Sequence, residues 1–310
     1  MKSTHVLLVG TGAVGSYYGG RLAQSGVKVS ALCRSDYKIV KKSGISIESH
    51  RGDFHFKPHQ VIQHARELKE KPDYILICLK VLPEIDTPSI IAPVLGPETS
   101  IVLLQNGVDI EEKFVHAFPK NEIISGIAFI AVSRISLGII KHLDYGRITL
   151  GSYPKGISAK SQQMIDLFKQ AGVPCNSTES IEATRWQKLV WNVPFNPISV
   201  LGGVVDTSQI MANEEMVSYI EKIMKEVVSI AEKLGHNLPD NVIEKNIADT
   251  KVMKPYLTSM ALDFLAGRRI EVEAILGNAL RKALCIDLPV PYIESLYQLL
   301  NLVDRKQREK

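Results

Sequence analysis

The chain has 310 residues, of which 45% are apolar and 23% charged, with a formal net charge of +4. These values describe ordinary globular material, long enough for about two domains. Lysine and arginine are dispersed and aromatic residues make up only 6% of the chain, which argues against a nucleic-acid-binding protein with a clustered basic face.

The cysteines, the apolar runs and the histidines exclude further classes of protein. The four cysteines lie far apart and form no CxxC motif, which favours a reducing cytoplasm. The longest apolar stretch, IISGIAFIAV, is too short to cross a bilayer, and the N-terminus does not read as a signal peptide. The histidines between residues 50 and 64 have no acidic or thiolate partners at ligand spacing. We therefore expect a cytoplasmic protein without export, membrane insertion or a metal site.

The first predicted elements form a nucleotide-binding turn. HVLLVG, residues 5–10, is typical of a strand buried on both faces, and the motif GTGAVG leads from it into a segment with helical spacing that Gly26 closes. Glycine at positions 10, 12 and 15 permits a tight turn, a close approach to a pyrophosphate and helix packing on the strand, while the helix N-terminus attracts phosphate. The residues predicted to bind a dinucleotide are Gly10, Thr11, Gly12, Ala13, Val14 and Gly15.

The end of the second predicted strand, VKVSALCR, bears on the choice of cofactor. An acidic residue there would bond a ribose 2′-hydroxyl and repel a 2′-phosphate, but the position holds Cys33, Arg34 and Ser35. Arginine offers a planar, permanently charged donor for phosphate, which favours NADP. The alternative is that Arg34 is a surface cation and that Asp36 caps the following helix, YKIVKK.

Polar residues follow the next two buried strands of the predicted parallel sheet. DYILICLK ends in Lys80, and TSIVLLQNG ends in Asn106 and Gly107. Ligands lie beyond the carboxyl ends of strands in open α/β sheets, so the side chains of Lys80 and Asn106 are predicted to reach a cofactor or substrate. In the alternative interpretation, Lys80 simply ends a strand and Asn-Gly is a turn dipeptide.

The pattern changes from strands to helices near residue 180. Residues 44–64 resemble a short strand pair, and residues 122–135 and 138–152 resemble two strands that extend the sheet as antiparallel members, with Asp144–Gly146 as a turn signal. A helix, SAKSQQMIDLFKQAG, and a strand, VPCNSTE, come next. From there apolar residues recur at three and four positions. We predict an α/β dinucleotide-binding domain at 1–179 and an all-α substrate-binding domain at 180–310.

The segment WQKLVWNVPFNP, residues 186–197, combines polar residues with apolar surroundings. Lys188, Asn192 and Asn196 recur at a spacing of four and would share one face of a helix. Burying unpaired polar groups is costly, so this stripe indicates a lined cleft, whereas a solvated face would carry more charge and less tryptophan. Pro194 and Pro197 predict a bend.

Three acidic or hydroxyl side chains follow in the predicted helical domain. Ser259 and Asp263 lie one turn apart on a helix whose first turn is predicted to contain Pro255. Glu271 falls at the start of a further helix, where it could merely complement the helix dipole.

Taken together, the sequence resembles the ketopantoate reductase (2-dehydropantoate 2-reductase) family from Gly10 to about Pro291. The matching motifs are GTGAVG, ICLK, QNG, WQKLVWNVPFNP and SMALDFLAGRRIEVE. The resemblance implies a Rossmann-type N-terminal domain, an all-α C-terminal domain, and NADPH-dependent reduction of ketopantoate to pantoate in pantothenate biosynthesis. Such a protein could assemble as a homodimer.

The resemblance also implies roles for single residues. Lys188 would be the general acid and Glu271 would accept from a substrate hydroxyl, while Lys80 and Asn106 would contact the cofactor or substrate. The remaining implied substrate ligands are Asn192, Asn196 and Ser259. Asp263 would support these ligands from a second layer of the site. Asp206 stands where the family often has asparagine, and Pro194 also departs from the family pattern; both leave the substrate open.

Three alternative functions remain open. The chain could reduce another 2-oxo acid, or it could be a β-hydroxyacid or glycerol-phosphate type dehydrogenase, which would need a further basic cluster. It could also be a non-catalytic NADPH-binding protein, which would have no use for Lys188, Asn192, Ser259 and Glu271 together.

Overall fold

The computed structural model describes residues 3–309 and divides them into two compact units. Unit 1 comprises the chain up to Lys80 together with Ile85–Gln105 and Glu111–Ile181. Unit 2 comprises Val81–Glu84, Asn106–Ile110 and the chain from Glu182 onwards. Unit 1 is α/β and unit 2 is helical, which confirms the predicted fold class. The roles given to the two predicted domains remain predictions.

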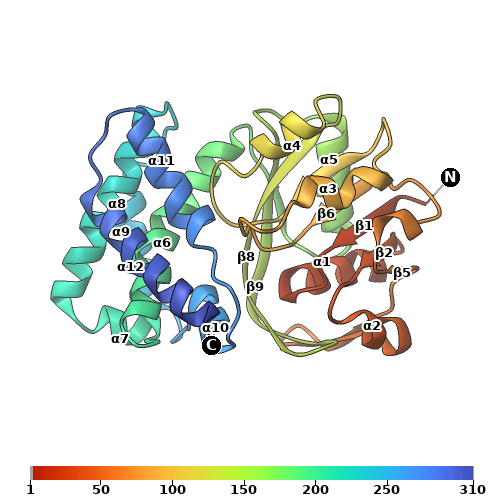
Figure 1. The fold of residues 1–310 in the computed structure, drawn as a ribbon, viewed down its shortest axis with the longest axis horizontal. Helices are drawn as coiled ribbons and strands as arrows, with labels where there is room; N and C mark the ends of the chain where they lie inside the picture. The colour runs from red at the N-terminus through yellow and green to blue at the C-terminus, as the bar shows by residue number, and fades with distance from the viewer. Residues whose placement is uncertain (1–2, 310) are drawn as a thin grey trace. The chain divides into compact units, whose positions relative to one another are not determined.

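A ten-stranded sheet forms the body of unit 1 (Figure 1). Its order is β4-β3-β9-β8-β7-β6-β1-β2-β5, with β10 beside β9. The strands are β1 His5–Val9, β2 Lys28–Leu32, β3 Ile45–Ser49, β4 Phe54–Phe56, β5 Val61–Ile62, β6 Tyr74–Ile77, β7 Ser100–Leu103, β8 Ile123–Ser136, β9 Ile139–Ser152 and β10 Cys175–Ser177. The parallel strands β1, β6 and β7 are buried along their whole length, as their continuous apolar runs predict.

The long strands β8 and β9 pair antiparallel, as predicted. The chain reverses at residues 137 and 138, where the two predicted strand segments meet, whereas the turn signal at Asp144–Gly146 lies inside β9. Phe129 pairs with Arg147 and Ile130 with Tyr145, so Gly146 is an extra residue that forms a β-bulge. The φ angles of Tyr145 and Gly146, 62° and 106°, are those of a turn, which is why the local sequence was misleading.

The helices of unit 1 are α1 Ala13–Gln24, α2 Tyr37–Ser43, α3 Thr87–Ile91, α4 Glu112–Ala117 and α5 Ala159–Gln170, with 3-10 turns η1 Ala65–Glu67 and η2 Ala92–Val94. Helix α1 packs against β1 and β2 and also against β3, β4, β8 and β9, so the sheet curls around it. Two glycines make this fit possible. A Cβ on Gly19 would lie 2.8 Å from Leu8, and a Cβ on Gly20 would lie 2.8 Å from Phe54.

Unit 2 is built from seven α-helices, seen in green to blue in Figure 1: α6 Ile181–Leu201, α7 Thr207–Met211, α8 Glu214–Lys233, α9 Val242–Val252, α10 Ser259–Leu265, α11 Asn278–Cys285 and α12 Pro291–Arg308. A π-helical turn, η3 Glu273–Gly277, precedes α11. Helix α6 is unbroken at Pro194 and Pro197. Pro255, in contrast, lies outside α10, because Thr258 caps that helix through its hydroxyl.

Within residues 3–309 no helix has both the length and the apolar character needed to cross a membrane. All four cysteines are free thiols.

Candidate functional site

The glycine-rich turn of unit 1 has the geometry that a dinucleotide site requires. Gly10 has φ 101°, and a Cβ there would lie 2.9 Å from the Leu79 nitrogen. A Cβ on Gly15 would lie 2.1 Å from the Gly10 carbonyl oxygen. Gly12, in contrast, has open space around it, and no side chain caps the N-terminus of α1. The turn therefore leaves its backbone donors accessible to a phosphate.

The residues after β2 divide between the surface and the interior. Arg34 is exposed, as a residue that meets an incoming phosphate would be. Asp36 is buried, and its carboxylate accepts a hydrogen bond from the Thr11 hydroxyl at 2.5 Å. Asp36 stands at the N-cap position of α2, as the alternative interpretation expects, but its side chain makes no capping hydrogen bond.

The ends of β6 and β7 are joined by a side-chain hydrogen bond. Gln105 Nε2 donates to the Leu79 carbonyl oxygen at 2.6 Å. Lys80 follows Leu79 and is half-buried, and Asn106 follows Gln105. Both predicted residues thus lie three positions beyond the carboxyl ends of strands.

The segment Asn106–Ile110 packs within unit 2. Arg185 of α6 donates to the Gly107 carbonyl oxygen at 2.9 Å, and Asn278 of α11 donates to the Val108 carbonyl oxygen at 2.7 Å. Gly107 has φ 96°, and a Cβ there would lie 2.3 Å from the Ala274 carbonyl oxygen. The loop is therefore held against the helices of unit 2, and only glycine fits at position 107.

Three predicted residues meet at this loop. Lys188 Nζ donates to Asn106 Oδ1 at 2.8 Å, and Asn106 Nδ2 lies 3.4 Å from Glu271 Oε2. Glu271 Oε1 accepts from the backbone nitrogen of Val81 at 2.9 Å. The amide of Asn106 thus links an ammonium to a carboxylate. Both carboxylate oxygens of Glu271 thus accept hydrogen bonds, one from the Asn106 side chain and one from the Val81 backbone.

The environment of Lys188 lowers its pKa to about 8. Burial is the main cause, because it disfavours the charged form, and the positive charge of Arg185 acts in the same direction. Glu271 opposes both by raising the pKa. A lysine with this pKa can give up a proton near neutral pH, as a general acid must.

The two asparagines of the stripe lie on α6 with Lys188 but are more deeply buried. Asn192 is 6% exposed and Asn196 is 1% exposed. Within the described residues the Oδ1 atom of Asn196 has no hydrogen-bond partner. The two asparagines lie four and eight positions beyond Lys188, on the same stripe of the helix. Their proposed substrate contacts therefore rest on the shared helix face.

Ser259 and Asp263 occupy different environments on α10. Ser259 is exposed at the first position of the helix. Asp263 is largely buried and forms an ion pair with Arg268 at 3.0 Å, which offsets its charge. Arg268 was not predicted. It could have been noticed only as a basic residue five positions from an acid in the motif SMALDFLAGRRIEVE.

Asp206, which departs from the family pattern, has a structural role. Its carboxylate accepts from the backbone nitrogen of Gln209 at 2.9 Å, and Gln209 Oε1 accepts from the Asp206 nitrogen at 2.9 Å. This reciprocal pair is a capping box at the start of α7. The acid is thus occupied at a helix end, where it need not repel a carboxylate substrate.

The sequence reasoning missed Arg185, which is 2% exposed although it carries a full charge. It precedes Lys188 by three positions, so the two lie on neighbouring parts of one helix face. A charged residue beside Trp186, three positions before Lys188, was the available signal.

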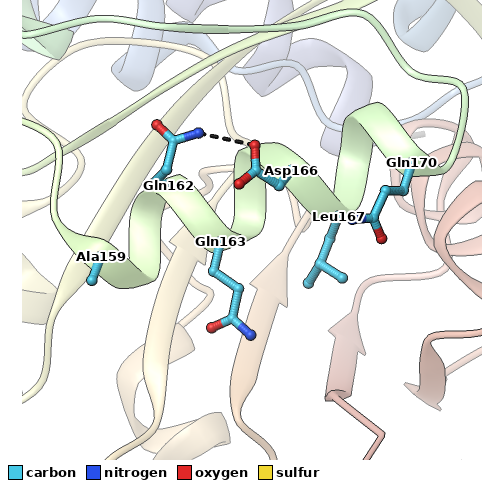
Figure 2. Close-up of a pocket in the computed structure, with 6 residues that line it drawn as sticks. All are labelled: Ala159, Gln162, Gln163, Asp166, Leu167 and Gln170. Atoms are coloured by element: carbon cyan, nitrogen blue, oxygen red, sulfur yellow. Dashed lines mark hydrogen bonds between the residues drawn. The ribbon is translucent and has the colours of Figure 1, made fainter.

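A hollow on the surface of α5 holds none of the predicted site residues (Figure 2). Its lining residues all come from this one helix: Ala159, Gln162, Gln163, Asp166, Leu167 and Gln170. Gln162 donates to Asp166 at 2.9 Å, so the single carboxylate is already bonded within the helix. We do not assign a catalytic role to this hollow.

Comparison with known proteins decides the family. The model "Ketopantoate reductase PanE/ApbA" matches residues 6–155, and its C-terminal counterpart matches residues 180–304. This chain belongs to the ketopantoate reductase family. The predicted resemblance is thereby confirmed, and the protein is an oxidoreductase of this type.

Several proteins are similar to this ketopantoate reductase family member over their whole length. A 2-dehydropantoate 2-reductase from Nostoc sp. is 36% identical and covers 99% of this chain and 98% of its own. The structure of a 2-dehydropantoate 2-reductase from Methylococcus capsulatus is 45% identical, with a TM-score of 0.92 and coverage of 98% of this chain and 97% of its own. A third, from Geobacter metallireducens, is 31% identical with a TM-score of 0.91 and coverage of 96% and 99%.

Proposed function

We propose that this protein reduces 2-dehydropantoate to pantoate with NADPH, in pantothenate biosynthesis. The observation that carries the proposal is the hydrogen bond from Lys188 to Asn106 in a setting that lowers the lysine pKa to about 8. The relatives named as 2-dehydropantoate 2-reductases support the choice of substrate. A cytoplasmic location and a homodimer belong to the same proposal.

Residues of unit 2 would bind and protonate the oxygen of the substrate carbonyl. The glycine-rich turn and Arg34 would hold NADPH, which when bound would supply the hydride for C2, so that the electron pair of the C=O bond would move to the oxygen. Lys188 would hold that oxygen and transfer a proton from its ammonium group, so that an alcohol forms. Asn106 would keep the ammonium in place through its Oδ1 atom.

The remaining predicted ligands would orient the substrate. The exposed Ser259 hydroxyl would donate to the carboxylate, and Asn192 and Asn196 would line the same helix face as Lys188. Glu271 accepts from Asn106 and Val81, and its carboxylate, with about four acceptor sites, would also accept from a substrate hydroxyl. This contact would favour hydroxylated 2-oxo acids, because a buried carboxylate left unmatched is costly.

A substrate screen tests the proposal. NADPH oxidation should be fastest with 2-dehydropantoate and slower with 2-oxo acids that lack its hydroxyl, such as 2-oxoisovalerate. A different preferred 2-oxo acid would identify the chain as a family member with another substrate. No oxidation with any 2-oxo acid, despite NADPH binding, would favour the non-catalytic alternative.

The cofactor proposal rests on Arg34 and the glycine-rich turn. The exposed guanidinium of Arg34 should give NADPH at least about tenfold tighter binding than NADH, which corresponds to roughly 1.4 kcal/mol. Arg34→Ala should narrow this gap mainly by weakening NADPH. Cofactor fluorescence measures both affinities, and Lys38→Ala, on the neighbouring exposed surface of α2, is the matched control. An equal loss for both cofactors would show that Arg34 is structural.

A further inference from the structure

Thr11 is held from two sides within the glycine-rich turn. Its hydroxyl donates to Asp36 Oδ2 at 2.5 Å, and its backbone carbonyl oxygen accepts from Ser16 Oγ at 3.0 Å. Thr11 is 6% exposed and Asp36 is 4% exposed. A hydrogen bond between a hydroxyl and an ionised carboxylate is among the stronger protein hydrogen bonds. It therefore fixes the segment after β2 to the turn that would bind the cofactor phosphates.

The segment after β2 carries both charges that bear on cofactor choice. In dinucleotide-binding folds an acid near the end of this strand bonds the ribose 2′-hydroxyl, and its charge opposes a 2′-phosphate. Here Arg34 is exposed, while Asp36, two residues later, is turned into the interior towards Thr11. The nearby Cys33 thiol adds no second negative charge, because burial raises its pKa to about 12.

We propose that Thr11 and Asp36 form a specificity-determining pair, in which the Thr11 hydroxyl holds the carboxylate away from the ribose so that Arg34 alone meets the 2′-phosphate. This inference rests on the proposed nicotinamide dinucleotide function. Thr11 is a positioning residue here: it acts through Asp36. In this proposal the preference for NADPH over NADH has two sources: the repulsive carboxylate of Asp36 is kept away from the 2′-phosphate, and the guanidinium of Arg34 attracts it.

Thr11→Val tests the pair, because valine keeps the shape of threonine and lacks the hydroxyl. The freed carboxylate should repel the 2′-phosphate of NADPH and accept from the ribose hydroxyl of NADH. The ratio of the NADH dissociation constant to the NADPH dissociation constant should fall at least about fivefold below the wild-type ratio. Cofactor fluorescence measures both constants. Thr11→Ala gives the same comparison if the valine variant does not fold.

Two further variants separate positioning from mere stabilisation of the turn. Thr11→Ser keeps the hydroxyl and should stay within about twofold of the wild-type ratio. The double variant Thr11→Val with Asp36→Asn removes the freed charge and should restore the ratio, although the hydrogen bond is still missing. If Thr11→Val weakens both cofactors equally and leaves the ratio unchanged, the pair only stabilises the turn and the inference is overturned.

The wild-type ratio distinguishes this inference from the cofactor proposal. A wild-type ratio near one would refute the NADPH preference, yet a shift towards NADH in Thr11→Val would still support the pair. A clear NADPH preference together with an unchanged ratio in Thr11→Val would support the cofactor proposal and refute the role of the pair. The shift should also persist in an Arg34→Ala background, because it comes from the charge of Asp36.

Discussion

Lys188 is the residue on which the proposed chemistry depends, because its ammonium, which donates a hydrogen bond to Asn106, is the proposed proton donor. Lys188→Ala should keep NADPH binding and lower turnover by about 10² to 10⁴, the range for losing a positioned general acid. Lys188→Arg keeps a positive charge but is a poor proton donor, so turnover should also fall. Steady-state kinetics and cofactor fluorescence measure the two effects.

The neighbouring Gln187 is the matched control for these variants. It is exposed on the same helix, and Gln187→Ala should leave turnover unchanged. If Lys188→Ala raises KM and leaves turnover intact, Lys188 anchors the substrate carboxylate and does not donate the proton.

The pKa of Lys188 gives a prediction for the pH dependence of reduction. The ammonium form is the acid, and the lowered pKa of about 8 means that this form is lost as the pH rises through 8. Turnover should therefore be nearly constant below about pH 7 and fall about tenfold per pH unit well above 8. A profile that stays flat to pH 10 would show that Lys188 keeps an ordinary pKa or is not the acid.

Arg185 provides the control for this profile. Its positive charge lowers the pKa of Lys188, so Arg185→Met should move the fall in turnover to higher pH. Arg185→Lys keeps the charge and should leave the position of the fall unchanged. A loss of activity without a shift would mean that Arg185 acts only through its hydrogen bond to Gly107.

At the scale of the element, α7 depends on Asp206 for its first turn. Asp206→Ala removes the acceptor for the Gln209 nitrogen and should cost about 1 kcal/mol of stability, as loss of an N-cap does. Hydrogen bonds from Ser208 and Gln209 lower the pKa of Asp206, so this stabilisation is present above the pKa of the unfolded chain. It is lost as the pH falls through the lower pKa of the folded state. Urea denaturation at neutral and acid pH measures it.

Asp206→Asn is the matched control, because asparagine is also a good N-cap. It should change stability by only a few tenths of a kcal/mol and leave KM for the 2-oxo acid unchanged. A markedly lower KM in this variant would contradict the structural role, since it would show that the acid repels the substrate carboxylate.

At the scale of the whole molecule, the loop Asn106–Ile110 belongs to unit 2 although its sequence lies between two parts of unit 1. Gly107→Ala places a Cβ 2.3 Å from the Ala274 carbonyl oxygen and should lower both stability and turnover, because Asn106 would move away from Lys188. Gly26→Ala is the control, because Gly26 also has a positive φ but open space around it. It should cost only the roughly 1–2 kcal/mol of a left-handed alanine and keep turnover.

Unfolding midpoints and steady-state rates measure both glycine variants. Equal losses of stability for the two variants, with turnover retained in Gly107→Ala, would mean that the close packing at Ala274 is relaxed without moving Asn106.

The features that depend on local pattern could be predicted from the sequence. The run HVLLVG and the motif GTGAVG specify a buried strand, a tight turn and a helix, and the structure has β1, the turn and α1 in that order. The spacing of Lys188, Asn192 and Asn196 placed them on one helix, α6, because helical periodicity is a property of neighbouring residues. The helical character of unit 2 followed from the same periodicity, and the combination of motifs gave the family.

The features that join distant residues could not be predicted, because they depend on how the chain folds back on itself. The bonds from Asn106 to Lys188 and to Glu271, and from Thr11 to Asp36, link residues whose sequence positions carry no sign of their pairing. The signal at Asp144–Gly146 is the same for a turn as for a bulge, and the pairing of β8 with β9 chose the bulge. Packing settles such alternatives because a buried polar group must find its partner wherever the fold brings one.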